Sequence, residues 1–74
     1  MIDKIREIIS DELDVEIDEV TPESDIIEDL GADSLAIVTI IMTIEDLYGI
    51  TIPDEAVIEL RTPDAVAKYV TENS

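Results

Sequence analysis

One short segment, from Glu28 to Leu35 (EDLGADSL), contains the residues best placed to support chemistry. Gly31 permits a tight turn, and either Asp33 or Ser34 can cap a following helix by accepting a hydrogen bond from one of its first N–H groups. From these residues alone, helix capping is the simpler interpretation of Ser34. A serine at a helix N-terminus also lies beside free N–H groups and the positive end of the helix dipole, which is a favourable place for an anion.

The composition argues against catalysis by the chain itself. The chain contains no cysteine and no histidine. This inventory excludes disulfides, thiolate metal sites, cysteine nucleophiles and histidine-dependent catalytic triads. We therefore expect no enzymatic activity, no catalytic residue and no metal site.

The charge of the chain predicts the kind of partner it has. Twenty acidic residues against four basic ones give a net charge of −16 over 74 residues. Because this surplus repels nucleic acid phosphates and anionic lipid, we expect neither nucleic-acid nor membrane binding. No segment approaches the length of a membrane span and the N-terminal residues are unlike a signal peptide, so a cytoplasmic location is expected. The natural partners should present basic surfaces.

Calcium binding is the alternative from a different functional class. Asp14, Glu16 and Asp18 have the spacing of the first ligands in a calcium-binding loop. The match is poor further along, since Glu19 stands where glycine is needed and Asp25 where a bidentate glutamate is usual. A small acidic calcium-binding or interaction protein is kept only as an alternative.

The spacing of apolar residues predicts an all-α fold. We expect a small four-helix bundle of three main helices and a short third one, in a single monomeric domain spanning residues 1–74. The expected elements are a helix over 2–13, a long loop over 14–32, a helix over 35–48, a short helix over 54–60 and a final helix that begins at 62–64.

The helix over 35–48 has to be argued against local propensity, because many of its residues are β-branched and favour a strand. The run is about twice as long as a typical strand and has no internal glycine or proline. It follows Asp33-Ser34, which favours a helix start, and precedes Gly49, which favours a helix end. Since it is apolar nearly all round, we expect it to be the central helix, packed on several sides.

The sequence resembles the acyl carrier proteins over essentially its whole length. The string Gly31-Ala32-Asp33-Ser34-Leu35 is similar to the signature of that family, whose serine is modified with phosphopantetheine. Other positions that match are Val20-Thr21, Glu28-Asp29-Leu30, Val38, Met42, Glu45, Ile52-Pro53-Asp54-Glu55, Thr62 and Tyr69.

The resemblance implies a carrier that holds acyl intermediates as thioesters on a 4′-phosphopantetheine arm attached to Ser34, with Asp33 and Leu35 beside it. A separate phosphopantetheinyl transferase would load the arm from coenzyme A. Acyl-transfer and chain-elongation enzymes of fatty acid or polyketide-type biosynthesis would then act on the cargo. A peptidyl or aminoacyl carrier, which shares the fold and the modified serine, is the alternative within the same mechanism.

The same resemblance implies an acyl pocket between the second and third helices and a surface that binds partners. Ordinary core packing is the alternative role of the pocket positions. The pocket positions are Ile26, Ile27, Ile44, Ile52, Val57, Leu60 and Val66. The partner-binding positions are Glu28, Asp29, Ala36, Ile37, Thr39, Ile40, Glu45 and Asp46.

Two positions depart from the family pattern. Members usually carry acids just after the signature and again three residues later, where this chain has Ala36 and Thr39. An acidic rim remains, but Ile37, Ile40 and Ile41 make the helix more apolar. We therefore hypothesise a dedicated set of partners with a more hydrophobic contact, and packing of these isoleucines in the core is the alternative.

Overall fold

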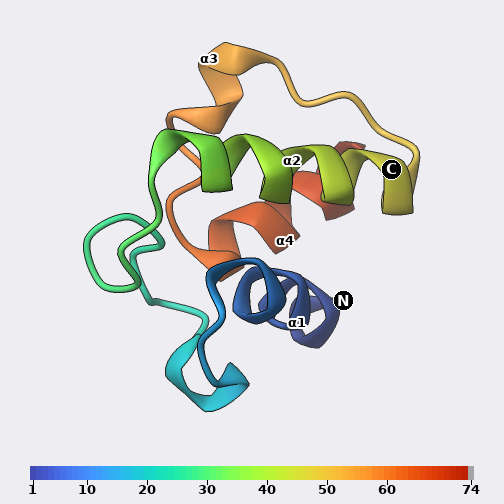
Figure 1. Ribbon diagram of the computed structural model, residues 1–74. Coiled ribbons are helices and arrows are strands. Elements are labelled where there is room, and N and C mark those ends of the chain that lie inside the picture. The colour runs from blue at the N-terminus through green and yellow to red at the C-terminus, as the bar shows by residue number, and fades with distance from the viewer. Residues whose placement is uncertain (74) are drawn as a thin grey trace.

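The computed structural model describes residues 1–73, and within them the chain is all-helical (Figure 1). The predicted small helical bundle, with a long loop between its first two main helices, is confirmed. Its elements are α1 (Ile2–Leu13), a 3₁₀ turn (Ile17–Glu19), α2 (Ser34–Tyr48), α3 (Asp54–Val57) and α4 (Pro63–Asn73).

The ends of the main helices follow the signals in the sequence. The chain leaves α1 at Asp14, whose φ of 56° is left-handed and whose N–H donates to the carbonyl of Ser10. The end of α2 is formed in the same way by Gly49, with a φ of 67° that glycine adopts without steric cost. The start of α4 is capped by Thr62, whose hydroxyl accepts the N–H of Ala65 at 3.1 Å.

The core is aliphatic and lies where α1 packs against both α2 and α4. Ile5 and Ile9 of α1 are completely buried, and so are Val66 and Val70 of α4. Each such side chain contributes about 1.5 to 3 kcal/mol by leaving water. This burial explains why the β-branched residues of α2 are helical, since packing of Ile44 and its neighbours in the core outweighs a local preference for strand.

One face of α2 stays open. In Figure 1, α2 lies between α3 and the pair formed by α1 and α4, as expected for a central helix. Only part of its surface is covered, however: Ile40 and Ile44 are buried, whereas Leu35, Val38 and Met42 are exposed. The prediction that α2 is packed on several sides is therefore right only in part, because α3 is too short to cover the length of α2.

The third helix is shorter than predicted. It was expected over 54–60, but α3 ends at Val57. The N–H groups of Glu59 and Leu60 donate three residues back, to Ala56 and Val57, both at 3.0 Å. These tighter turns leave Ile58 75 % exposed and bring Leu60 into the core. The segment after α3 is therefore fixed by the burial of one leucine and not by a continued helix.

The long loop is held against the helices by buried side chains and by one arginine. Val20 is completely buried, and the carbonyl of Val20 accepts a hydrogen bond from Nε of Arg6 on α1. The same guanidinium donates through Nη2 to the carbonyl of Ile17 at 3.0 Å. Arg6 therefore fixes the first half of the loop to α1.

Replacing Arg6 with methionine should lower the free energy of unfolding by about 2 kcal/mol, because charge-assisted hydrogen bonds to two loop carbonyls are lost. Urea unfolding measures this difference. Lys4→Met is the matched control, since Lys4 also lies on α1 and its ammonium group makes an exposed contact with Glu7 at 3.5 Å. Equal destabilisation by the two substitutions would contradict the role of Arg6.

Candidate functional site

Ser34 is the first residue of α2, and its neighbour Asp33 performs the capping. Oδ1 of Asp33 accepts the N–H of Ala36 at 2.8 Å, and the carbonyl of Asp33 accepts the N–H of Ile37 at 3.0 Å. The choice between Asp33 and Ser34 that the sequence left open is thus decided by geometry. Within residues 1–73 the Ser34 hydroxyl forms no hydrogen bond, and the residue is exposed.

The residues before Ser34 place it at the surface. Gly31 has a φ of 74°, and its N–H donates to the carbonyl of Ile27 at 3.1 Å. Ala32 is 6 % exposed and its N–H donates to the carbonyl of Ile26 at 3.1 Å. The chain is thus anchored in the core at Ala32 and emerges from it two residues later at Ser34.

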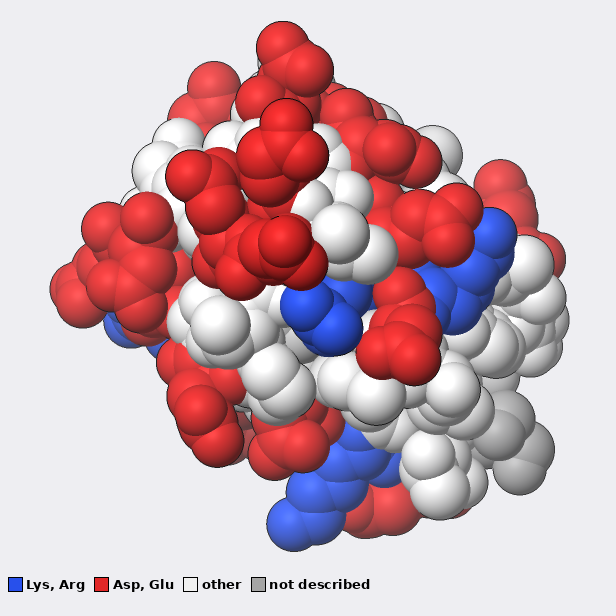
Figure 2. All heavy atoms as spheres, turned by 90° about the horizontal axis from the view of Figure 1, so that it is seen from below, with Lys and Arg blue, Asp and Glu red and all other residues white. Residues whose placement is uncertain are grey.

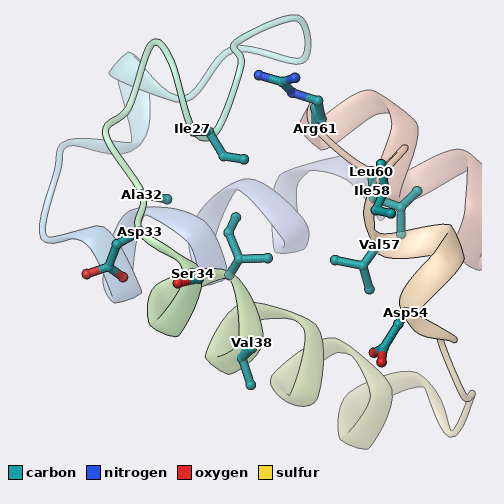
Figure 3. Close-up of a pocket in the computed structure, with 11 residues that line it drawn as sticks. Ile27, Ala32, Asp33, Ser34, Val38, Asp54, Val57, Ile58, Leu60 and Arg61 are labelled. Atoms are coloured by element: carbon teal, nitrogen blue, oxygen red, sulfur yellow. The ribbon is translucent and has the colours of Figure 1, made fainter.

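An apolar pocket opens beside Ser34, bounded by α2, by the segment around α3 and by the end of the long loop (Figure 3). Its volume is about 660 Å³, within the range of about 300 to 1,000 Å³ usual for sites that enclose a small ligand. Its walls are formed by Ile27, Ala32, Asp33, Ser34, Ile37, Val38, Asp54, Val57, Ile58, Leu60 and Arg61.

The pocket contains only part of the set predicted from the sequence. Ile27, Val57 and Leu60 line it. The remaining four predicted positions are buried in the core and do not form its wall; they are Ile26, Ile44, Ile52 and Val66. The sequence analysis missed Ile37 and Val38 as wall residues, although their spacing of three and four from Ser34 puts them on the same side of α2. It also missed Ile58 and Arg61, whose positions depend on where α3 ends.

The predicted partner-binding positions have several different environments. Glu28, Asp29 and Asp46 are exposed, whereas Ala36 and Thr39 are half-buried. Glu45 is also half-buried, and Oε2 of its carboxylate accepts the N–H of Ile52 at 2.7 Å. Glu45 therefore holds the linker after α2 in place.

The two isoleucines of the predicted partner surface do not lie on an open face. Ile40 is 2 % exposed and belongs to the core, which is the alternative that the sequence left open for it. Ile37 is half-buried and forms part of the pocket wall. Exposed apolar positions that the sequence analysis did not assign to the partner surface are Leu35, Val38, Met42, Leu47 and Ile58.

Asp25 organises the turn that leads to the pocket. Its Oδ1 accepts the N–H of Ile27 at 2.9 Å and of Glu28 at 2.8 Å, and its Oδ2 lies 3.1 Å from Nη2 of Arg61. The N–H of Glu28 lowers the pKa of Asp25 below its ordinary value, and the N–H of Ile27 and the Arg61 guanidinium act in the same direction. Partial burial opposes them.

Acidic side chains are spread widely over the molecule. Figure 2 shows them over much of the face seen from below, with basic side chains scattered between them. Across residues 1–73, acidic side chains do not gather in threes that could hold a metal ion. The calcium loop considered at Asp14, Glu16 and Asp18 therefore gains no support. None of the helices in this part of the chain is long and apolar enough to cross a membrane.

The pH dependence of stability should reveal the role of Asp25. Because its pKa is lowered in the folded chain, ionised Asp25 stabilises the fold above its unfolded pKa, and this contribution is lost as the pH falls through the folded pKa. Asp25→Asn should thus lower the free energy of unfolding at neutral pH. At pH values well below about 4, the free energies of unfolding of the variant and the parent should become more alike. Urea unfolding across that range gives the measurement.

Asp11→Asn is the control for this experiment, because it removes the same charge from an exposed position of α1. It accounts for any relief of repulsion among the acids. At neutral pH, Asp25→Asn should lower the free energy of unfolding more than Asp11→Asn does. An equal or smaller effect of Asp25→Asn would contradict the role given to Asp25.

Comparisons with known proteins identify relatives along the whole chain. Residues 3–70 match the family model described as "Phosphopantetheine attachment site". Proteins named "Acyl carrier protein" from three strains of Clostridium perfringens are each 49 % identical over 74 residues, which covers 100 % of this chain and 97 % of each relative. A solved structure of the acyl carrier protein from Enterococcus faecalis is similar with a TM-score of 0.85 and 36 % identity, covering 99 % of this chain and 92 % of that chain.

Proposed function

The chain belongs to the acyl carrier protein family, and from this premise we propose that its 4′-phosphopantetheine is attached to Ser34. Proteins of this family are carriers and not enzymes, and fatty acid biosynthesis is their usual role. The observation that carries the proposal is the exposed Ser34 hydroxyl, left free by the capping of α2 through Asp33, at the edge of an apolar pocket.

The residues around Ser34 fit such a group. The first N–H groups of α2 and its positive dipole end favour a phosphodiester on the hydroxyl. The carboxylate of Asp33 is the unfavourable neighbour, but it is engaged with the N–H of Ala36. Phosphopantetheine supplies the thiol on which an acyl thioester forms, and the chain itself has no cysteine.

Loading by a separate phosphopantetheinyl transferase is proposed from the family, and it agrees with a chain that has no histidine to serve as a general base. In that reaction the Ser34 oxygen forms a bond to phosphorus while the pyrophosphate bond of coenzyme A breaks. The serine proton passes to a base of the transferase, and the nucleotide portion of coenzyme A leaves. What Ser34 contributes is an accessible hydroxyl at a fixed place on a rigid helix end.

The pocket is the proposed site of the acyl chain. Its wall offers Ile27 from the loop, Val57 from α3 and Leu60 from the segment that follows, so an acyl chain would be enclosed between α2 and α3. The four buried isoleucine and valine positions predicted from the sequence would form the layer behind this wall. Burial of methylene groups against these side chains would drive enclosure of the cargo, at about 0.8 kcal/mol for each CH₂.

Partner enzymes would bind the open face of α2 and α3. Leu35, Val38 and Met42 form an apolar strip on α2, and Ile58, the residue directly after α3, adds to it. Asp33 and Asp54 lie in the pocket wall with Val38 and Ile58, and together with the exposed Glu28, Asp29 and Asp46 they would attract a basic surface. The proposed partners are a phosphopantetheinyl transferase and acyl-transfer and chain-elongation enzymes that combine basic and apolar contacts. We keep the hypothesis that this set is a dedicated one.

The proposal also covers the organisation and location of the chain. Residues 1–74 would form a single monomeric domain, and the matched family region spans 3–70. A cytoplasmic place of action is proposed because coenzyme A and the biosynthetic enzymes would have to reach Ser34. Acyl cargo is favoured over peptidyl or aminoacyl cargo because the relatives at 49 % identity are acyl carrier proteins.

Incubation with coenzyme A, magnesium and a promiscuous phosphopantetheinyl transferase should add the mass of one phosphopantetheinyl group to the parent chain. The Ser34→Ala variant should gain nothing, because the acceptor hydroxyl is absent. Thr51→Ala, which removes another exposed hydroxyl, is the control and should be loaded like the parent. Intact mass spectrometry measures all three. Loading of Ser34→Ala, or none of the folded parent, would refute attachment at Ser34.

The apolar strip can be tested with the same transferase. Met42→Asn should raise the KM for the unloaded chain about tenfold, equivalent to about 1.4 kcal/mol, with little change in kcat, because a polar amide replaces an apolar contact. Leu47→Asn is the matched control, since Leu47 is similarly exposed on α2 but lies near its far end. An equal effect of the two substitutions would argue against docking at the strip.

A further inference from the structure

The pocket beside Ser34 has one basic residue in its wall, Arg61. Arg61 lies between α3 and α4, and in Figure 3 its side chain extends toward the loop that carries Ile27, on the side of the pocket away from α2. Its Nη2 lies 3.1 Å from Oδ2 of Asp25 and 3.6 Å from Oε1 of Glu28. The guanidinium thus connects the two segments that bound this side of the pocket.

A backbone hydrogen bond reinforces the same connection. The carbonyl of Arg61 accepts the N–H of Ile26 at 2.8 Å, and Ile26 is almost completely buried. Asp25 in turn binds the N–H groups of Ile27 and Glu28. The side chain of Arg61 is therefore tied to the turn that positions Ile27, which is itself a wall residue of the pocket.

The side of the pocket formed by α3 is less restrained. The helix α3 has only four residues, and it is not among the closely packed helix pairs of residues 1–73. Growth of an enclosed acyl chain toward α3 therefore displaces a short element. An acyl chain that extends past Ile27 and Leu60 reaches the segments joined by Arg61. To make room for it, the ion pair of Arg61 or its backbone hydrogen bond must break or shift.

We infer that the Arg61 latch, meaning the ion pairs of Arg61 with Asp25 and Glu28, limits the length of acyl chain that the pocket encloses. This inference rests on the proposed attachment of the arm at Ser34. The groups of the latch are partly exposed to solvent, so its strength is modest and is reduced by salt. Each further methylene group favours enclosure, and the latch opposes it once the chain reaches the closed side.

The test uses chains loaded with straight saturated acyl groups of increasing length. A promiscuous transferase attaches butanoyl, hexanoyl, octanoyl, decanoyl and dodecanoyl arms from the corresponding acyl-coenzyme A, and intact mass confirms each product. The melting temperature of each product is compared with that of the same chain carrying the arm without an acyl group. Arg61→Met and Asp25→Asn break the latch. Lys4→Met, remote on α1, is the control for loss of a positive charge.

The melting temperature of the parent should rise with acyl length up to a limit and then stay constant. In both latch variants the melting temperature should level off at an acyl chain at least one two-carbon unit longer than in the parent. The parent should show the same shift in salt concentrated enough to screen the ion pairs of Arg61. Lys4→Met should level off where the parent does. The position of the plateau is read within each variant, so a general loss of stability in a variant does not move it.

Two results would overturn the inference, and they differ from each other. A parent chain that takes up no arm, as judged by mass, refutes the attachment at Ser34 and the latch with it. Loaded chains whose plateau falls at the same acyl length in the parent and in both latch variants refute the latch alone.

Discussion

The fold depends on pinning a long, irregular loop to a small aliphatic core. Val20, Ile26 and Ala32 are buried with the side chains of α1, α2 and α4. Arg6 binds the carbonyls of Ile17 and Val20 from α1. Because backbone groups of a loop need partners when they leave water, such anchors are required. They also have a functional consequence: α2 begins two residues after Ala32, so the pinned loop determines where Ser34 lies.

Around Ser34, structural and functional roles are divided between neighbouring residues. Asp33 caps α2, so the Ser34 hydroxyl is exposed and is not needed as the helix cap. A 660 Å³ apolar pocket adjoins it, and the open strip of Leu35, Val38 and Met42 lies on the same helix. One helix start can thus serve attachment, storage of cargo and recognition, which suits a carrier that performs no chemistry of its own.

Much of this could be predicted from local sequence, and the rest depends on tertiary contacts. Periodicity gave the bounds of α1, and Gly49 gave the end of α2, because these signals act within one or two turns. The length of α3 could not be predicted, since it is fixed by the burial of Leu60 in the core. Whether Ile40 lies at the surface or in the core also depends on tertiary packing. So does the position of Arg61, which faces acids more than thirty positions earlier and was missed.

The account's central claim is that an acyl group carried on Ser34 lies in the pocket between α2 and α3. The most direct measurement is a set of nuclear Overhauser effects on the octanoyl-loaded chain with labelled methyl groups. The account predicts contacts from the octanoyl methylenes to the methyl groups of Ile27, Val57 and Leu60. Contacts to none of these methyl groups, with the acyl chain in solvent or elsewhere on the surface, would contradict it.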